Sequence, residues 1–208
     1  MDEALLAHTP NEMEYYLRVT PCAHCGGPLV PQEPQPAGQA EGPGGVAGRA
    51  TVRVRCRKCH RGRTYRFAWQ FDTSARPDAD DCINPSDKPS RIVDLVQWMG
   101  LYYQFSEAVS GAASPAEARR DARRAALCLE EALKFHAGEE LPPETALFCE
   151  ASRTAYRDSP DNYARARLQE LQARLPAAAR PEADASPGDQ AGGGQDRHWW
   201  RFWKHRGK

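Results

Sequence analysis

The sequence predicts an α+β fold: a small N-terminal β-hairpin module, then an antiparallel α-helical bundle, then a disordered C-terminal tail. Three observations support this prediction. Hydrophobic residues alternate with polar ones over residues 51–70, as in half-buried strands. They recur with a helical period over residues 91–175. Residues 176–195 contain, apart from proline, no apolar side chain larger than alanine, so they cannot build a core.

Composition divides the chain into six segments, because glycine, proline and charge runs mark boundaries between periodic stretches. The 208 residues are enough for one ordinary domain or two small ones. The predicted segments are an N-terminal segment (1–17), a hairpin module (18–70) with a flexible Gly/Pro-rich loop (31–49), an Asp/Pro-rich linker (71–90), a helical domain (91–175), a disordered linker (176–195) and a cationic aromatic tail (196–208).

Two strands of the hairpin are read directly from the alternation. Val52 and Val54 alternate with arginines in TVRVRC, and Tyr65, Phe67 and Trp69 alternate with polar or small residues in TYRFAW. The intervening RKCHRG is short enough for a tight turn. We therefore expect a β-hairpin with cysteines at its tip.

Four helices are expected in the helical domain. Ser90 is the predicted N-cap of the first, which covers RIVDLVQWMGLYYQFSEAV. The second begins at Ser114 with a capping box and a proline at its first position, and it ends at Gly138. Two more begin near Pro143 and at Ser159. Short connections between these helices predict antiparallel packing.

Two C-x-x-C pairs, Cys22–Cys25 and Cys56–Cys59, are separated by 30 residues. Each pair folds back so that both sulfurs point at one ion, and two such turns complete the tetrahedral shell that Zn²⁺ prefers. Gly26 directly follows the first pair and gives its turn access to positive φ. Four thiolates leave no open coordination position, so the predicted zinc is structural rather than catalytic.

This arrangement resembles the zinc-ribbon superfamily, in which two cysteine knuckles, the second on a β-hairpin, hold one zinc. The resemblance covers about residues 18–70 and implies that Cys22, Cys25, Cys56 and Cys59 are the ligands. His60 stands where such proteins commonly have glycine. The stretch INPSDKPSRIVDLVQW also resembles uncharacterised bacterial proteins that join a zinc ribbon to a helical domain, and this brings no activity with it.

Other interpretations of the cysteines stay open. They could be free thiols in a core, or His24 or His60 could replace one cysteine ligand. Residues 56–60 also spell C-x-x-C-H, the haem c attachment motif, which requires export. A thiol–disulfide enzyme would need a βαβ context, which the sequence does not predict.

Seven basic residues lie on the hairpin without a neighbouring acid. Arginines that meet phosphate, with aromatic residues that stack on bases, would make a nucleic-acid surface. Alternatively, these cations form a solvated or protein-binding face, offset the negative zinc site, or pair with Asp72, Asp78, Asp80, Asp81 and Asp87. The seven candidates are Arg53, Arg55, Arg57, Lys58, Arg61, Arg63 and Arg66.

The tail DRHWWRFWKHRGK is amphipathic if helical. Its apolar side would hold Trp199, Trp200, Phe202 and Trp203, and its polar side would include Arg201 and Lys204. We expect it to dock on a partner protein, to lie in an anionic membrane interface, or to fold back on its own chain.

Net charge and compartment complete the prediction. The chain has 28 Lys+Arg and 28 Asp+Glu, yet residues 51–70 carry +7 and residues 196–208 carry +4. No apolar run approaches a membrane span, and the N-terminus has no secretory pattern, so we expect a cytoplasmic protein without a transmembrane segment.

No catalytic motif is found in the sequence. The leading hypothesis is a non-enzymatic zinc-binding adaptor or regulatory interaction protein whose expected partner is another protein. The alternative is a nucleic-acid-binding zinc ribbon that uses the arginine strand.

Overall fold

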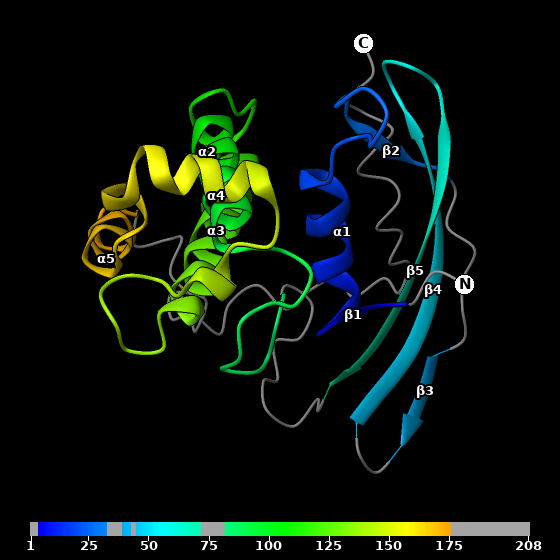
Figure 1. Cartoon of the computed structure of the whole chain (residues 1–208), viewed down its shortest axis with the longest axis horizontal. Coiled ribbons are helices and arrows are strands. Elements are labelled where there is room, and N and C mark those ends of the chain that lie inside the picture. The colour runs from blue at the N-terminus through cyan, green and yellow to red at the C-terminus, as the bar shows by residue number, and fades with distance from the viewer. Residues whose placement is uncertain (1–3, 33–38, 43–44, 72–81, 176–208) are drawn as a thin grey trace.

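A computed structural model describes residues 4–32, 39–42, 45–71 and 82–175. The predicted disordered linker (176–195) and the tail with Trp199, Trp200, Arg201, Phe202, Trp203 and Lys204 lie outside the described residues. Within them the protein is a mixed fold of one sheet and a group of helices, which confirms the α+β prediction at that level (Figure 1).

The sheet is built on two long antiparallel strands. β4 (Gly45–Cys56) pairs with β5 (Gly62–Phe71), with Arg53 opposite Thr64. β1 (Leu5–Ala7) lies parallel to β5 at one edge, and β2 (Leu29–Pro31) lies antiparallel to β4 at the other. The order is β1-β5-β4-β2, and a further strand, β3 (Gln39–Gly42), also pairs with β4.

One face of this sheet is covered by α1 (Pro10–Val19), which stands between the sheet and the other helices (Figure 1). Val52 and Phe67 are each 1% exposed on this inner face. The ring of Tyr16 in α1 meets Tyr65 and Phe67 edge-on, with centroids 5.7 Å apart in both pairs. The two strands predicted from alternation are therefore present, with the expected apolar side chains turned inward.

The remaining helices pack together beyond α1. α2 lies along α3, α4 contacts α2, and α5 contacts α3. Tyr15 of α1 packs against Trp98 and Phe105 of α2, at centroid distances of 5.5 and 6.0 Å, so one hydrophobic core joins sheet and helices. The antiparallel-bundle prediction goes further than these contacts and stays a prediction. The helices are α2 (Leu95–Ser110), α3 (Pro115–Leu133), α4 (Glu150–Asp158) and α5 (Arg165–Ala173), with 3₁₀ turns at Lys134–His136, Glu144–Ala146 and Pro160–Tyr163.

One of the two predicted helix caps is correct. Ser114 caps α3, and its hydroxyl accepts from the backbone N–H of Glu117 at 3.2 Å. Ser90 is not the cap of α2, because it closes the turn before the helix. Asp94 is the cap, and it shares two reciprocal 2.9 Å bonds with Gln97. A complete capping box satisfies two helix N–H groups, which explains why the helix begins there.

The segment predicted as a flexible loop (31–49) contains strand. β3 and the first residues of β4 occupy 39–42 and 45–49, where β5 offers backbone partners as far as Phe71. Gly48 is required for packing, because a Cβ there would lie 2.4 Å from the ring of Trp69. The glycine at position 48 is therefore explained by close packing against Trp69 and not by chain flexibility.

Hydrogen bonds join residues 82–90 of the predicted linker to the start of α1 and to the C-terminal end of α3. Thr9 donates to the carbonyl of Ile83 at 2.5 Å, and the Asn84 amide donates to Glu131 of α3 at 3.2 Å. Lys134 donates to the carbonyl of Asn84 at 2.9 Å. The domain boundaries themselves stay predictions.

Candidate metal centre and cationic sheet face

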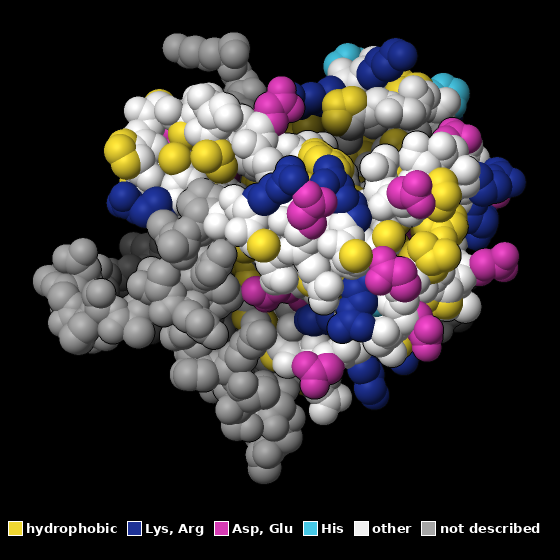
Figure 2. Space-filling view, turned by 90° about the vertical axis from the view of Figure 1, so that its left-hand side faces the viewer, with side chains coloured by type: hydrophobic (Ala, Val, Ile, Leu, Met, Phe, Trp, Pro, Cys, Tyr) yellow, Lys and Arg dark blue, Asp and Glu magenta, His cyan; other side chains and the backbone are white. Residues whose placement is uncertain are grey.

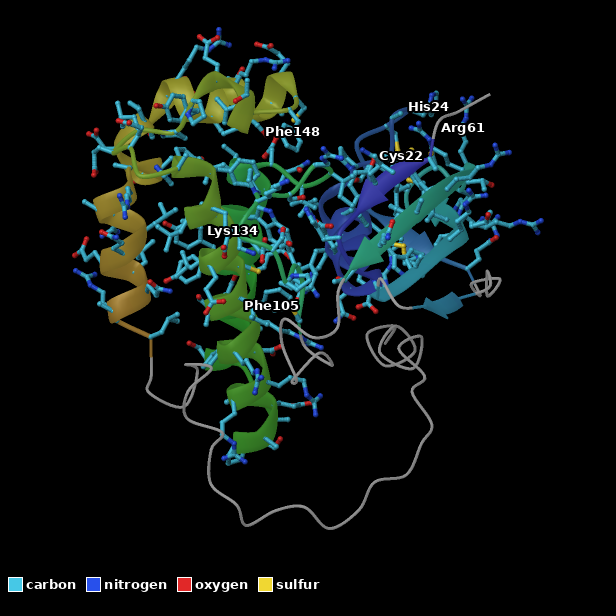
Figure 3. All side chains as sticks on the ribbon, turned by 90° about the horizontal axis from the view of Figure 1, so that it is seen from below. Cys22, His24, Arg61, Phe105, Lys134 and Phe148 are labelled. Carbon is cyan, nitrogen blue, oxygen red and sulfur yellow. The ribbon has the colours of Figure 1, made fainter. Side chains whose placement is uncertain are left out.

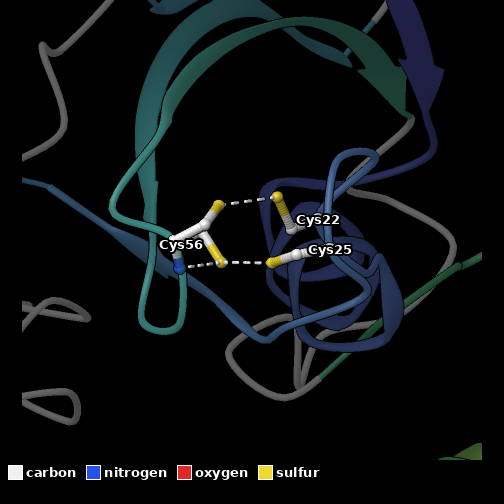
Figure 4. A group of neighbouring side chains, drawn as sticks. Cys22, Cys25 and Cys56 are labelled. Carbon is white, nitrogen blue, oxygen red and sulfur yellow. Dashed lines mark hydrogen bonds between the residues drawn. The ribbon is translucent and has the colours of Figure 1, made fainter.

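The four cysteine sulfurs meet at one end of the sheet, and each lies within 4.8 Å of the others. The Sγ atoms of Cys22 and Cys59 are 3.6 Å apart, and those of Cys25 and Cys56 are 3.5 Å apart (Figure 4). A tetrahedral zinc with Zn–S bonds of about 2.3 Å requires sulfurs about 3.8 Å apart. The donor set and its size therefore fit one Zn²⁺ ion.

The two knuckles repeat one another bond for bond. The N–H of Gly26 donates to the carbonyl of Cys22 at 2.8 Å, and the N–H of His60 donates to the carbonyl of Cys56 at 3.0 Å. Gly26 and His60 both have left-handed backbone, at φ of 68° and 60°. Histidine thus adopts the turn for which zinc ribbons commonly use glycine, at a cost that glycine avoids.

Gly27 is a site residue that the sequence analysis did not single out. A Cβ at this position would lie 2.8 Å from the Cβ of Lys58, 3.0 Å from the Sγ of Cys56 and 3.4 Å from the Sγ of Cys25. No side chain fits there, because the two knuckles touch. The second glycine of Cys25-Gly26-Gly27 was the feature of the sequence that could have indicated this close contact.

The backbone around the sulfurs favours thiolates unequally. The N–H groups of Cys59 and Lys58 donate to the Cys56 sulfur at 3.5 and 3.4 Å and lower its pKa to about 6. The N–H groups of His24 and Cys25 lower the pKa of Cys22 in the same way.

Cys59 behaves differently from these two cysteines. The N–H of Arg61 lowers its pKa, but burial and the neighbouring sulfurs outweigh this and raise the pKa to about 12. A bound metal ion would favour the thiolate form of all four sulfurs, since metal binding releases protons from its ligands.

Neither histidine of the knuckles belongs to the sulfur cluster. His24 and His60 are exposed, and the four cysteines are the only group of three or more possible ligands found in the part of the chain that the structure describes. Figure 3 shows Cys22, His24 and Arg61 at the same end of the sheet. The alternative in which a histidine replaces a cysteine ligand gains no support.

The outer face of the sheet, opposite α1, is strongly cationic. Arg53 and Arg55 of β4 and Arg66 of β5 project from it and are exposed, with Arg66 opposite Thr51. Arg49, which the sequence analysis did not include, shares their strand side and exposure. We call these four residues the arginine face, and no described element covers it (Figure 1).

The other predicted basic residues lie elsewhere. Arg63 is on the inner side of β5, where its guanidinium stacks on the ring of Tyr65 at 4.9 Å. Three exposed cations, which we call the knuckle cations, occupy the turn that joins β4 to β5 and lead on from the arginine face; they are Arg57, Lys58 and Arg61.

The predicted stacking aromatics are not on the arginine face. Tyr65, Phe67 and Trp69 are buried on the inner side, where Tyr16 of α1 packs on Tyr65 and Phe67 and the ring of Trp69 lies beside Gly48. The expectation that they stack on bases beside the arginines is wrong. In an antiparallel pair with one buried face, alternate residues point to opposite sides, so arginines and aromatics separate.

No member of the arginine face makes an ion pair with a described residue. Asp87, one of the five predicted partners, also makes no ion pair with a described residue. The other four, Asp72, Asp78, Asp80 and Asp81, lie outside the described residues. The helical side contrasts with the sheet, because acidic and basic side chains are interspersed there (Figure 2) and pair, as Arg153 does with Glu150 at 3.1 Å.

Comparison with known proteins adds no relative. The chain matches no model of a known protein family, and no curated protein and no solved structure is significantly similar to it. None of the described helices has the length and apolar character needed to cross a membrane. The resemblance to zinc ribbons therefore rests on the four cysteines and their geometry alone.

Proposed function

We propose that this protein is a non-enzymatic, zinc-stabilised nucleic-acid-binding protein whose arginine face contacts the phosphate backbone. One observation carries the proposal: four exposed arginines share one sheet face that no described residue neutralises or covers. The knuckle cations continue the positive charge beyond the end of the strands. Phosphate contacts of this kind supply most of the affinity of sequence-independent binding.

The zinc has a structural role in this proposal. Four thiolates close the coordination shell and leave no position for a substrate or water. The ion would join the first knuckle, which precedes β2, to the second knuckle between β4 and β5, and so hold the strands that carry the arginines.

The proposal predicts a steep dependence of affinity on salt. Each neutralised phosphate of duplex DNA adds about −0.9 to the slope of log K against log salt concentration. The four residues of the arginine face would give a slope of about −3.6, and the knuckle cations would make it steeper.

A binding experiment with matched variants tests this. The zinc-loaded full-length chain is titrated into labelled DNA and RNA at 50–200 mM salt and followed by fluorescence anisotropy. The triple variant R53Q/R55Q/R66Q should bind more than tenfold more weakly at 50 mM salt and flatten the slope by about 2.7. The control R119Q/R157Q/R174Q removes the same charge from exposed arginines of the helices and should bind like the wild type.

Two outcomes would overturn the proposal. One is no binding of DNA or RNA at low salt by the zinc-loaded chain. The other is an equal loss of affinity in both triple variants, because a general charge effect would then explain the binding.

The adaptor hypothesis depends on the tail at residues 196–208. This segment lies outside the described residues, so the hypothesis keeps its sequence basis, an aromatic side opposite a cationic one. We propose it as a separate activity of the same chain, with a partner protein or an anionic membrane surface as the target.

A further inference from the structure

We infer that the nucleic acid held by the arginine face is a duplex, recognised through its backbone without stacking on bases. The inference rests on the proposed function and specifies its substrate. It follows from the side chains that share the outer face and from those that are excluded from it.

The outer face has no stacking platform. Its described positions on β4 and β5 are arginine, threonine, alanine and glutamine, in two facing rows: Arg49, Thr51, Arg53 and Arg55 on β4, and Thr64, Arg66, Ala68 and Gln70 on β5. Proteins that hold single strands place aromatic rings under successive bases, at about 1–3 kcal/mol per base. The hairpin has such rings, but all three are buried on the inner side of the sheet, which faces α1.

The burial of these rings is not easily reversed. Phe67 is 1% exposed and lies within the main core, and the ring of Trp69 fills the space beside Gly48. Bringing either ring to the outer face would require a register shift by one residue, which would expose the whole apolar row. The described outer face therefore offers guanidinium, hydroxyl, amide and aliphatic groups, including the exposed Leu6 beside Ala68, but no aromatic ring.

The arginines lie at regular intervals along the strands, and this spacing suits the regular phosphate backbone of a duplex. Alternate residues of a strand are about 6.6–6.8 Å apart, so the row from Arg49 to Arg55 on β4 extends about 20 Å. Arginine guanidinium groups bind phosphate oxygens bidentately. Arg55 is also held in place, because its Nε donates to the carbonyl of His60 at 3.1 Å. A duplex presents its phosphates to these arginines at fixed positions, whereas a flexible single strand must become ordered before its phosphates can meet them.

Counterion release gives the size of the preference. A contacted phosphate contributes about −0.9 to the salt slope in a duplex and about −0.7 in a single strand. With four contacts the two slopes differ by about 0.8, so duplex binding is about tenfold tighter at 50 mM salt when the two affinities are taken as equal at 1 M salt. Stacking would reverse the order, but the outer face cannot supply it.

The experiment compares one 20-base-pair DNA duplex with each of its separated strands at 50 mM salt. It uses the full-length, zinc-loaded chain with Trp199, Trp200, Phe202 and Trp203 replaced by alanine, so that the tail cannot stack on bases. We expect the duplex to bind about tenfold more tightly than either strand. R53Q/R55Q/R66Q in the same background should abolish most of this difference.

The outcomes separate this inference from the proposed function. Equal or tighter binding of the single strands, still sensitive to R53Q/R55Q/R66Q, would overturn the duplex inference and leave nucleic-acid binding in place. Absence of binding to duplex and single strands alike would overturn both. A duplex preference that survives R53Q/R55Q/R66Q would also contradict the inference, because another surface would then be responsible.

Discussion

His60 shows how one residue can depart from a pattern and still perform its part. It closes the second knuckle at φ 60°, the same turn that Gly26 closes at 68° in the first. A side chain in this region of φ costs about 1–2 kcal/mol of folding free energy. A glycine would remove this strain, but its unfolded chain has more conformational freedom, which offsets part of the gain in stability. The departure from glycine therefore lowers stability without preventing the turn.

The variant His60→Gly should accordingly be more stable than the wild type by about 0.5–1 kcal/mol. Urea unfolding of the zinc-loaded protein measures this. His24→Gly is the matched control, because His24 is an exposed knuckle residue without positive φ. His24→Gly should lower the unfolding free energy, because it makes the unfolded chain more flexible without relieving strain. An equal loss in His60→Gly would contradict the account of the turn.

Glu131 makes stability depend on pH. Burial raises its pKa from 4.5 to about 7, against the opposing effect of Lys134, whose Nζ is 2.7 Å from the carboxylate. The folded state therefore holds a proton that the unfolded state releases near pH 4.5. Stability from this group is present at low pH and is lost as pH rises to about 7.

Glu131→Gln tests this contribution, since glutamine cannot titrate. Between pH 5 and 8 the wild type should lose up to about 3 kcal/mol of unfolding free energy relative to the variant. Urea unfolding at saturating zinc gives the difference at each pH. Glu139 is exposed, so the unfolding free energy of Glu139→Gln should change with pH as it does in the wild type. The same pH dependence in Glu131→Gln as in the wild type would refute the prediction.

Among the helices, the two caps differ in what they hold together. Ser114 caps α3 at the exposed surface through one N–H, that of Glu117. Asp94 is buried, caps α2, and also accepts from the backbone N–H of Phe148 at 3.1 Å. Asp94 therefore joins the start of α2 to the segment that leads into α4.

Removing the two caps should have unequal effects. Ser114→Ala should cost about 1 kcal/mol, the usual value for one cap. Asp94→Ala should cost about 2–4 kcal/mol, because Asp94 is buried and the substitution also removes the bond from the N–H of Phe148. Thermal unfolding of both variants checks the order, and equal losses would show that the bond to Phe148 contributes nothing.

Local patterns predicted the elements well where neighbours in sequence decide the structure. The alternation at 51–70 identified β4 and β5, and S-P-A-E identified the start of α3. The start of α2 was placed at Ser90 because a serine before an apolar run is also a possible N-cap, whereas the capping box of Asp94 and Gln97 sets the start four residues later. β3 was missed because its pairing partner in β4 cannot be recognised from a Gly/Pro-rich composition.

At the scale of the whole molecule, the candidate metal ligands could be predicted from the sequence, but the arrangement around them could not. C-x-x-C spacing is a local signal, so Cys22, Cys25, Cys56 and Cys59 could be predicted, and they do meet. The parallel pairing of β1 with β5, and the place of α1 between sheet and helices, depend on contacts between distant residues. Arg49 escaped notice for the same reason, since the segment around it was expected to be a loop.

Deletion of residues 196–208 tests the adaptor hypothesis separately from the rest. The shortened chain should keep its zinc, its unfolding transition and its R53Q/R55Q/R66Q-sensitive DNA binding, and it should lose recovery of partner proteins in a pull-down from cell extract. Unchanged recovery of the same partners would exclude the tail as the docking element.

The central claim is that four thiolates hold one structural zinc, and metal analysis of the purified chain tests it most directly. Elemental analysis together with a thiol count should give one zinc per chain, and Cys56→Ser should bind far less zinc because it removes one of the four ligands. A zinc content well below one per chain, with Cys22, Cys25, Cys56 and Cys59 all reduced, would contradict the account.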